Sequence, residues 1–211
     1  MRLAIFGASG GIGRAVMAAA LSEGHEVTAL TRDAARLADM ENEHLRVVEG
    51  DAREPAVVAR VVGGADAVIS ALGATANRPE EADMAAAAMR SMVDAMLSTD
   101  TRRLVALSGA AITMPGEAKP LSGRVAAWVV DRAAHWVVEA KRRESAIIAG
   151  SDLDWTLVRP PNVVAGPARG TATLRLSLPA ESFRVTQGDV AAALLRCATD
   201  RIFVREAPFV G

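Results

Sequence analysis

The stretch from Leu3 to Val16 constrains the fold of this chain more than any other part of the sequence, because an apolar run leads through a glycine-rich turn into an amphipathic helical pattern. Gly7 can adopt a positive φ where the strand ends, Gly10 lets the backbone approach a pyrophosphate, and Gly13 allows close packing of the helix on the strand. The first N–H groups of a helix lack partners, so a phosphate is stabilised there without a basic side chain. The turn predicts a dinucleotide site, the alternative being an ordinary glycine-rich turn. The residues of this site are Gly7, Ala8, Ser9, Gly10, Gly11, Ile12 and Gly13.

The rest of the chain alternates between apolar strands and helical stretches. After the first strand, we expect strands at 26–32, 45–50, 65–73, 103–108 and 153–158, and helices at 12–22, from 52 onward, and at 79–100, 124–148 and 187–199. A short strand within 171–178 and a final extended segment at 203–210 are also expected. This alternation predicts a doubly wound α/β Rossmann fold with a mostly parallel sheet, the strand order 3-2-1-4-5-6 and helices on both faces. Because 51% of the 211 residues are hydrophobic, we expect one domain over residues 1–211.

Composition argues against several kinds of partner. Lys and Arg number 24 against 25 Asp and Glu, without blocks of like charge, so neither nucleic acid nor an anionic membrane surface is expected as a partner. No apolar run is long enough to span a bilayer, and glycines interrupt the N-terminal apolar run, so we expect a cytoplasmic protein without a targeting segment. The single cysteine, Cys197, is expected to be buried, and no Cys/His cluster has metal-ligand spacing. The sequence does not indicate an oligomeric state.

The spacing Gly-x-x-Gly-x-x-Gly resembles that of the short-chain dehydrogenase/reductase superfamily. Together with Leu30–Asp33, Glu49–Asp51 and Leu153–Pro161, it makes nearly the whole chain similar to the atypical NAD(P)-binding branch of that superfamily. This branch includes the NmrA-like proteins and the biliverdin/flavin reductases. The resemblance implies a Rossmann fold that binds a nicotinamide dinucleotide.

Arg32 stands at the end of the second expected strand, where the adenosine ribose of a dinucleotide arrives in a βαβ unit. An acidic residue at that place would accept hydrogen bonds from both ribose hydroxyls, whereas an arginine suits a 2′-phosphate. Arg36 follows one helical turn later and can hold the same phosphate. We therefore expect NADP(H) as the cofactor, with NAD(H) less favoured. The neighbouring Asp33 argues against this preference, and the alternative for Arg32 is a solvated side chain.

Other cofactor contacts are expected after the third, fourth and sixth strands. The resemblance implies that Asp51, followed by Ala52, lies near the adenine, although Asp51 can also cap the next helix. The small residues after the fourth strand suit close passage of the chain beneath a cofactor. The resemblance also implies that the segment after the sixth strand contacts the nicotinamide carboxamide; the alternative for its asparagine is an ordinary loop position. The residues after the fourth strand are Ala71, Leu72 and Gly73, and the residues after the sixth strand are Pro160 and Asn162.

The superfamily's usual catalytic pair is Tyr-x-x-x-Lys, in which the lysine lowers the pKa of a phenol that protonates a carbonyl. This chain contains no tyrosine; Lys141 matches the lysine of the pattern, and Val137 stands where the tyrosine would be. The resemblance places Ser108 at the catalytic-site serine, with a serine that merely leaves a strand as the alternative. Lys141 is expected to touch the nicotinamide ribose or to lie on the helix surface, in a charged run at 141–144 that is typical of a solvated face. His135 can line the pocket, or it is packed or faces solvent.

Two classes of function fit these residues. The first is a reductase that passes hydride from NADPH to a small-molecule acceptor such as a flavin or a quinone, in a pocket formed by residues 109–135 and 160–186. Such an acceptor needs no side-chain acid, because water can supply the proton. The second is a non-catalytic NAD(P)-binding sensor of the NmrA-like kind. We favour the reductase, because 211 residues leave little room for a partner-binding domain. An epimerase or dehydratase ranks third, because no acid–base pair is visible.

Overall fold

The computed structural model describes residues 1–178 and 184–211. Within them, the main sheet has six parallel strands in the order β3-β2-β1-β4-β5-β6, which confirms the predicted fold class and strand order. The order reverses between β1 and β4, and the carboxyl ends of the strands border a crevice at such a switch point. The strands are β1 (Arg2–Phe6), β2 (Glu26–Thr31), β3 (Leu45–Glu49), β4 (Ala67–Ser70), β5 (Arg103–Leu107) and β6 (Asp154–Val158).

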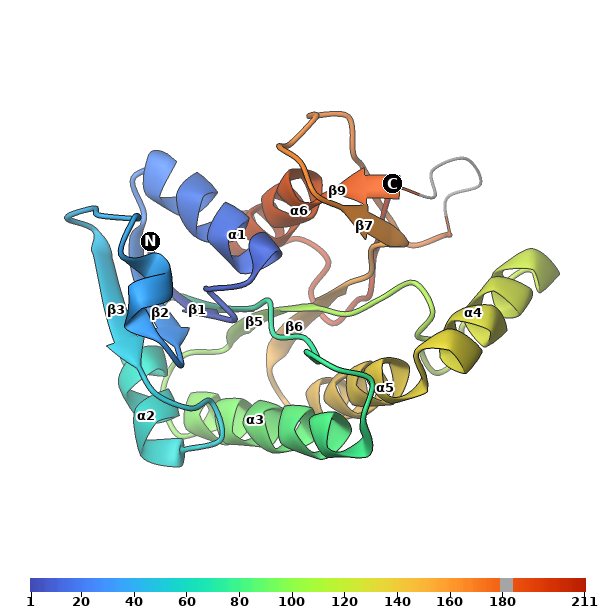
Figure 1. Cartoon of the computed structure of the whole chain (residues 1–211), viewed down its shortest axis with the longest axis horizontal. Coiled ribbons are helices and arrows are strands. Elements are labelled where there is room, and N and C mark those ends of the chain that lie inside the picture. The colour runs from blue at the N-terminus through green and yellow to red at the C-terminus, as the bar shows by residue number, and fades with distance from the viewer. Residues whose placement is uncertain (179–183) are drawn as a thin grey trace.

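Helices cover both faces of this sheet (Figure 1). On one face, α1 (Gly11–Ser22) packs against α6 (Gln187–Thr199). On the other face lie α2 (Pro55–Val62), α3 (Pro79–Leu97) and α5 (His135–Ala149), and a short 3₁₀ helix, η1 (Ala34–Leu37), follows β2. The second expected helix therefore begins at Pro55, three residues later than predicted, because proline fits the first helical turn.

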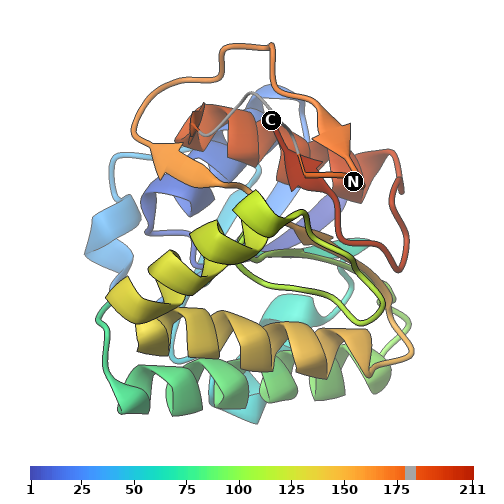
Figure 2. The ribbon, with the colours of Figure 1, turned by 90° about the vertical axis from the view of Figure 1, so that its right-hand side faces the viewer.

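The region 124–148 forms two helices, so the prediction of a single helix is wrong. The helix α4 (Leu121–Ala133) ends at Ala134, whose φ of −141° and ψ of 51° lie outside the helical range. Figures 1 and 2 show that α4 projects away from the sheet, whereas α5 runs beside α3. Alanine favours helix, so the break has no local signal. A contact from a distant loop supports the start of the second helix. The side-chain oxygen of Asn77 accepts a hydrogen bond at 2.7 Å from the backbone N–H of Trp136, in the first turn of α5.

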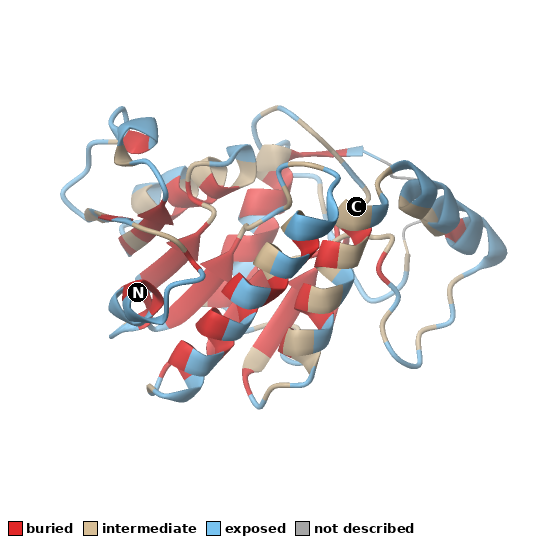
Figure 3. Cartoon of the chain, turned by 60° about the horizontal axis from the view of Figure 1, so that its bottom comes forward, coloured by how far each residue is buried: buried red, intermediate tan, exposed pale blue. Residues whose placement is uncertain are grey.

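The strands are buried along most of their length, while the helices expose their outer sides (Figure 3). Two buried apolar clusters result, one on each face of the sheet. Cys197 is buried as predicted, and burial raises the pKa of its thiol to about 11. No helix among residues 1–178 and 184–211 combines the length and the apolar character that crossing a bilayer requires.

Beyond β6 the chain forms two short strand pairs. β7 (Asn162–Val164) pairs in parallel with β9 (Arg184–Thr186), and β8 (Leu174–Arg175) pairs antiparallel with β10 (Phe209–Val210). The strand predicted within 171–178 is thus only two residues long. The segment 203–210 is not extended throughout, because Phe203 and Arg205 have φ values of 54° and 58°.

Candidate functional site

The glycine-rich turn after β1 has a backbone that excludes other residue types at two positions. Gly7 has a φ of 76°, and a Cβ there would lie 2.7 Å from the carbonyl carbon of Ala71. A Cβ on Gly13 would collide with the carbonyl oxygen of Gly7. The helix α1 starts at Gly11, and no side chain caps its first N–H groups. These N–H groups and the helix dipole suit the turn to a phosphate.

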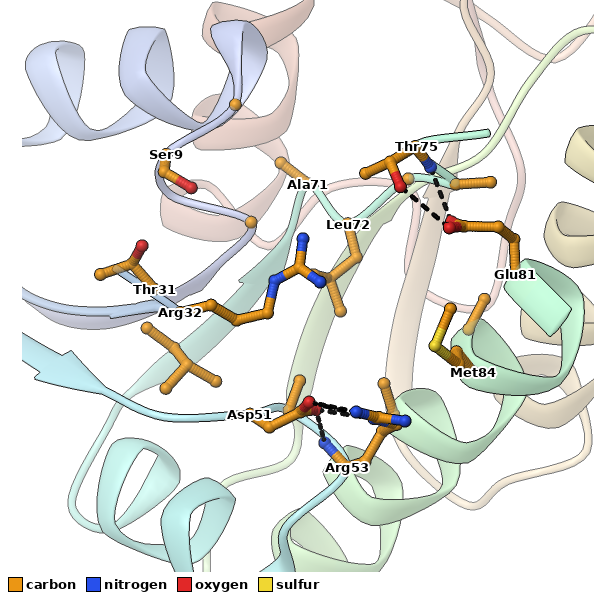
Figure 4. Close-up of a pocket in the computed structure, with 18 of the residues that line it drawn as sticks. Ser9, Thr31, Arg32, Asp51, Arg53, Ala71, Leu72, Thr75, Glu81 and Met84 are labelled. Carbon is orange, nitrogen blue, oxygen red and sulfur yellow. Dashed lines mark hydrogen bonds and ion pairs between the residues drawn. The ribbon is translucent and has the colours of Figure 1, made fainter. Parts of the chain in front are cut away.

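A cleft of about 270 Å³ lies beside this turn, at the carboxyl ends of β1 to β4 (Figure 4). Many of the predicted cofactor residues line it, namely Gly7, Ser9, Gly10, Arg32, Arg36, Asp51, Ala52, Ala71, Leu72 and Gly73. Other predicted residues are not part of its lining: Ala8, Gly11, Ile12, Gly13, Ser108, Lys141, Pro160 and Asn162. Gly11 packs instead against the side-chain amide of Gln187 at the start of α6, a neighbour that sequence reasoning did not identify.

Two guanidinium groups border one end of the cleft. The side chain of Arg32 extends into the opening (Figure 4). Arg36 donates a hydrogen bond to the carbonyl of Ser9 at 3.3 Å, which joins η1 to the glycine-rich turn. The carboxylate of Asp33 accepts a hydrogen bond from the backbone N–H of Ala35 at 3.0 Å and caps η1. Asp33, the residue that argues against a 2′-phosphate, therefore caps η1.

Two further pairs fix the walls of the cleft (Figure 4). The side chain of Arg53 donates to Asp51 at 2.5 Å, and this bond holds the pKa of the Asp51 carboxyl below its ordinary value. On the opposite wall, the backbone N–H and the hydroxyl of Thr75 donate to the carboxylate of Glu81 at 2.8 and 2.9 Å. Sequence reasoning gave Arg53, Thr75 and Glu81 no role at the site. Asp51 does not cap α2, because the N-cap residue of that helix is Glu54.

Lys141 and Glu144 form a buried ion pair beneath the ends of β4 and β5. The Nζ of Lys141 lies 2.7 Å from the Oε2 of Glu144 and also donates to the carbonyls of Leu72 and Leu107, at 2.5 and 2.9 Å. Burial raises the pKa of the Glu144 carboxyl, although the charge of Lys141 acts in the opposite direction. The Oε1 of Glu144 is buried without a hydrogen-bond partner, and Glu144 lines the cleft.

For two of its four residues, this pair corrects the interpretation of the charged run 141–144 as mostly a solvated face, whereas Arg142 is exposed and Arg143 is partly exposed. The side chains of Lys141 and Glu144 are only 12% and 4% exposed. Sequence reasoning missed Glu144 because lysine and glutamate in such a run usually face water. Their spacing of three residues is the available signal, since it places both side chains on one side of a helix.

The hydroxyl of Ser108 lies against α5, 3.0 Å from the hydroxyl of Ser145, and both serines are buried. The backbone N–H of Ser108 donates to the carbonyl of Val158 at 2.8 Å, which continues the pairing of β5 with β6. Ser108 directly follows Leu107, whose carbonyl binds Lys141. The side chain of Ser108 is therefore held by Ser145 on α5 and does not point into solvent.

Of the remaining predicted residues, His135 and Asn162 are exposed and Pro160 is buried. The side chain of His135 is 52% exposed, its Nδ1 lies 3.5 Å from Asp131, and its ring meets the edge of Trp136. The carbonyl of Pro160 accepts a hydrogen bond from the backbone N–H of Ala110 at 3.0 Å. Asn162 is exposed at the start of β7.

The chemistry of the cleft fits the phosphate groups of a dinucleotide. The backbone of a glycine-rich turn, an uncapped helix start and the side chains of Arg32 and Arg36 offer donors and positive charge to phosphate groups. Among residues 1–178 and 184–211, no three His, Cys, Asp or Glu side chains come together in a way that could hold a metal ion.

Comparison with known proteins agrees with this chemistry. Over 185 residues, the chain is 32% identical to a 3-diazoavenalumate denitrifying reductase of a Streptomyces species, a match that covers 82% of this chain and 59% of that protein. This chain spans just over half the length of the first curated relatives that it matches.

Solved structures share the fold over the whole chain. The anaerobilin reductase ChuY of Escherichia coli O157:H7 superposes with a TM-score of 0.81 at 22% identity, covering 100% of this chain and 96% of that one. A short-chain dehydrogenase/reductase of Veillonella parvula in complex with NADP superposes with a TM-score of 0.78 at 22% identity, covering 100% and 94%. The model of a protein family described as NAD(P)H-binding matches residues 7–201, and the chain belongs to this NAD(P)H-binding family.

Proposed function

We propose that this protein is an NADPH-dependent reductase whose acceptor is a flavin-like or quinone-like molecule. The observation that carries the proposal is a dinucleotide cleft in a chain that contains no tyrosine. Bound NADPH would supply the hydride. An acceptor that is readily reduced and takes its proton from water needs no side-chain acid, so the missing phenol favours this class of acceptor.

The proposed cofactor contacts follow the walls of the cleft. The N–H groups of the turn from Gly7 to Gly13 would bind the pyrophosphate, and Asp51 and Ala52 would lie beside the adenine. Arg32 and Arg36 would hold a 2′-phosphate, and their position together with the cap formed by Asp33 supports NADPH over NADH.

Ser108, Lys141, Pro160 and Asn162 are proposed to border the nicotinamide half. The ammonium group of Lys141 has three hydrogen-bond donors, and all three already have protein partners. Lys141 ties the ends of β4 and β5 to α5, and it must exchange one of these bonds to reach a ribose hydroxyl. It therefore differs from a lysine that is free to activate a phenol.

The acceptor is proposed to bind between residues 109–135 and residues 160–186. Within the second segment, residues 179–183 lie outside the described part of the chain. The helix α4 presents exposed apolar side chains, among them Leu121, Val125 and Trp128. Such surfaces suit a planar aromatic molecule. His135 lies at the start of α5 and is proposed to border this pocket. The relative from Streptomyces is named a reductase, which supports the same class of activity.

The test combines two measurements on the purified protein: the Kd of NADPH, and NADPH oxidation with flavins, quinones and simple aldehydes and ketones. We expect NADPH binding together with turnover on a flavin or a quinone. Tight binding without turnover on any acceptor would favour the non-catalytic sensor. Efficient reduction of simple aldehydes or ketones would show that another group replaces the phenol.

Two variants then separate the proposed roles. If Ser108 or His135 takes part in the chemical step, Ser108→Ala or His135→Ala lowers kcat while the Kd of NADPH stays unchanged. An unchanged kcat for either variant would remove that residue from the mechanism.

A further inference from the structure

Three carboxylates line the cleft among the described residues, and Glu144 differs from the other two. Both oxygens of Asp51 accept hydrogen bonds from Arg53, and both oxygens of Glu81 accept hydrogen bonds from Thr75. Glu144 is bonded only through Oε2, to Lys141, although the residue is 3% exposed. Its Oε1 is an acceptor without a donor.

A buried acceptor without a partner is rare in folded proteins, because burial removes the water that would otherwise satisfy it. Lys141 cannot fill the vacancy, since its three donors already reach Leu72, Leu107 and Oε2 of Glu144. The nearby hydroxyls of Ser108 and Ser145 bond to each other. A ligand in the cleft that Glu144 lines can supply the donor that Oε1 lacks.

The place of Glu144 in the fold indicates which part of a dinucleotide supplies that donor. The arginines and Asp51 follow β2 and β3, on one side of β1, and mark the adenosine end. Glu144 is attached through Lys141 to the ends of β4 and β5, on the other side of β1. A dinucleotide lies across the switch point between β1 and β4, so its nicotinamide riboside half faces β4 and β5.

We infer that the free Oε1 of Glu144 accepts a hydrogen bond from the nicotinamide riboside half of the cofactor, from a ribose hydroxyl or from the carboxamide amino group. The inference rests on the proposed function for the identity of the cofactor. Glu144 is then a binding residue that the usual lysine pattern does not contain, and the Lys141–Glu144 pair presents an acceptor where a lone lysine would present donors.

The test compares two ligands that share the adenosine end. NADPH carries the nicotinamide riboside, whereas adenosine 2′,5′-bisphosphate lacks it. In Glu144→Gln, Lys141 retains an oxygen partner, but an amide N–H₂ replaces the free acceptor. We expect the Kd of NADPH to rise roughly tenfold or more, because the hydrogen bond to Oε1 is lost, while the Kd of the bisphosphate changes less than about twofold. Glu139→Gln is the matched control, since it removes the same charge from α5 at a partly exposed ion pair with Arg142 and Arg143, outside the lining of the cleft.

An unchanged Kd of NADPH in Glu144→Gln, or an equal loss for both ligands, would overturn the inference. Failure of the unsubstituted protein to bind NADPH would instead overturn the proposed function. If Glu144→Gln does not fold, the double variant Lys141→Met, Glu144→Gln is compared with Lys141→Met alone, so that the two proteins differ only at residue 144, and the same ratio of Kd values decides.

Discussion

Arg159 and Glu117 form an ion pair at the end of β6, with 2.6 Å between Nη1 and Oε2. The guanidinium of Arg159 is buried, lies 3.8 Å from the centre of the Phe209 ring and donates to the carbonyls of Ala207 and Ile112. One side chain thus joins the loop after β5 to the C-terminal segment. That loop borders the proposed acceptor pocket, so the pair holds one of its walls.

The free energy of unfolding is expected to fall in acid, in part through Glu117. Burial by itself would raise the pKa of this carboxyl, but hydrogen bonds from Arg159 and from the backbone N–H of Met114 outweigh that effect and lower the pKa. A carboxyl with a lowered folded-state pKa adds stability above its unfolded pKa of about 4.3 and loses it as the pH falls through the folded value. Glu117→Gln should cost about 1–3 kcal/mol near neutral pH and less in acid, measured by urea denaturation. An equal cost across the pH range would show that the charge of Glu117 is not responsible.

The sequence predicts features of this fold that depend on local chemistry. Gly13 is required because a Cβ there would collide with the carbonyl oxygen of Gly7 in the same turn, and Gly7 has a φ of 76°, which favours glycine. The strand order follows from apolar strands that alternate with helical stretches, because crossover connections in parallel sheets obey strict rules of handedness.

Features that depend on contacts between distant segments are not predictable in this way. Ala134 ends α4 although alanine favours helix, and the contact that supports the next helix comes from Asn77 in the loop after β4. Glu144 belongs to a charged run whose composition predicts exposure to solvent. Glu144 is buried because α5 packs beneath β4 and β5. The shape of the acceptor pocket depends on loops in the same way.

Asn77→Ala is expected to destabilise the fold by about 1 kcal/mol, because its side chain acts as a helix cap supplied from another loop. The first turn of α5 has no cap from its own N-cap residue, Ala134. The free energy of unfolding in urea measures the loss. Asn77→Asp retains the acceptor oxygen and should keep most of the stability, so equal losses in the two variants would argue against the capping role.

Arg32→Ala is expected to weaken NADPH binding about 10- to 100-fold, because a charge-assisted hydrogen bond to the 2′-phosphate is lost. The Kd of NADH should change little, so the ratio of the two Kd values is the measurement. Arg60→Ala, on the exposed side of α2, removes an equal charge away from the cleft and should leave both Kd values unchanged. Equal losses for NADPH and NADH in Arg32→Ala would contradict a phosphate contact.

Two glycines of the turn should separate folding from binding. A methyl group on Gly13 would meet the carbonyl oxygen of Gly7, a backbone atom that cannot move aside, so Gly13→Ala should lower the free energy of unfolding by about 3 kcal/mol or more. Gly10 has a φ of −82°, and a Cβ there meets the same oxygen at an ordinary 3.4 Å, so Gly10→Ala should cost no more than about 1 kcal/mol. Because Gly10 lines the cleft where a pyrophosphate approaches the backbone, Gly10→Ala should still raise the Kd of NADPH about tenfold or more. Urea denaturation and NADPH titration on both variants test this pair of expectations, and a stable Gly10→Ala variant with unchanged Kd would place the pyrophosphate elsewhere.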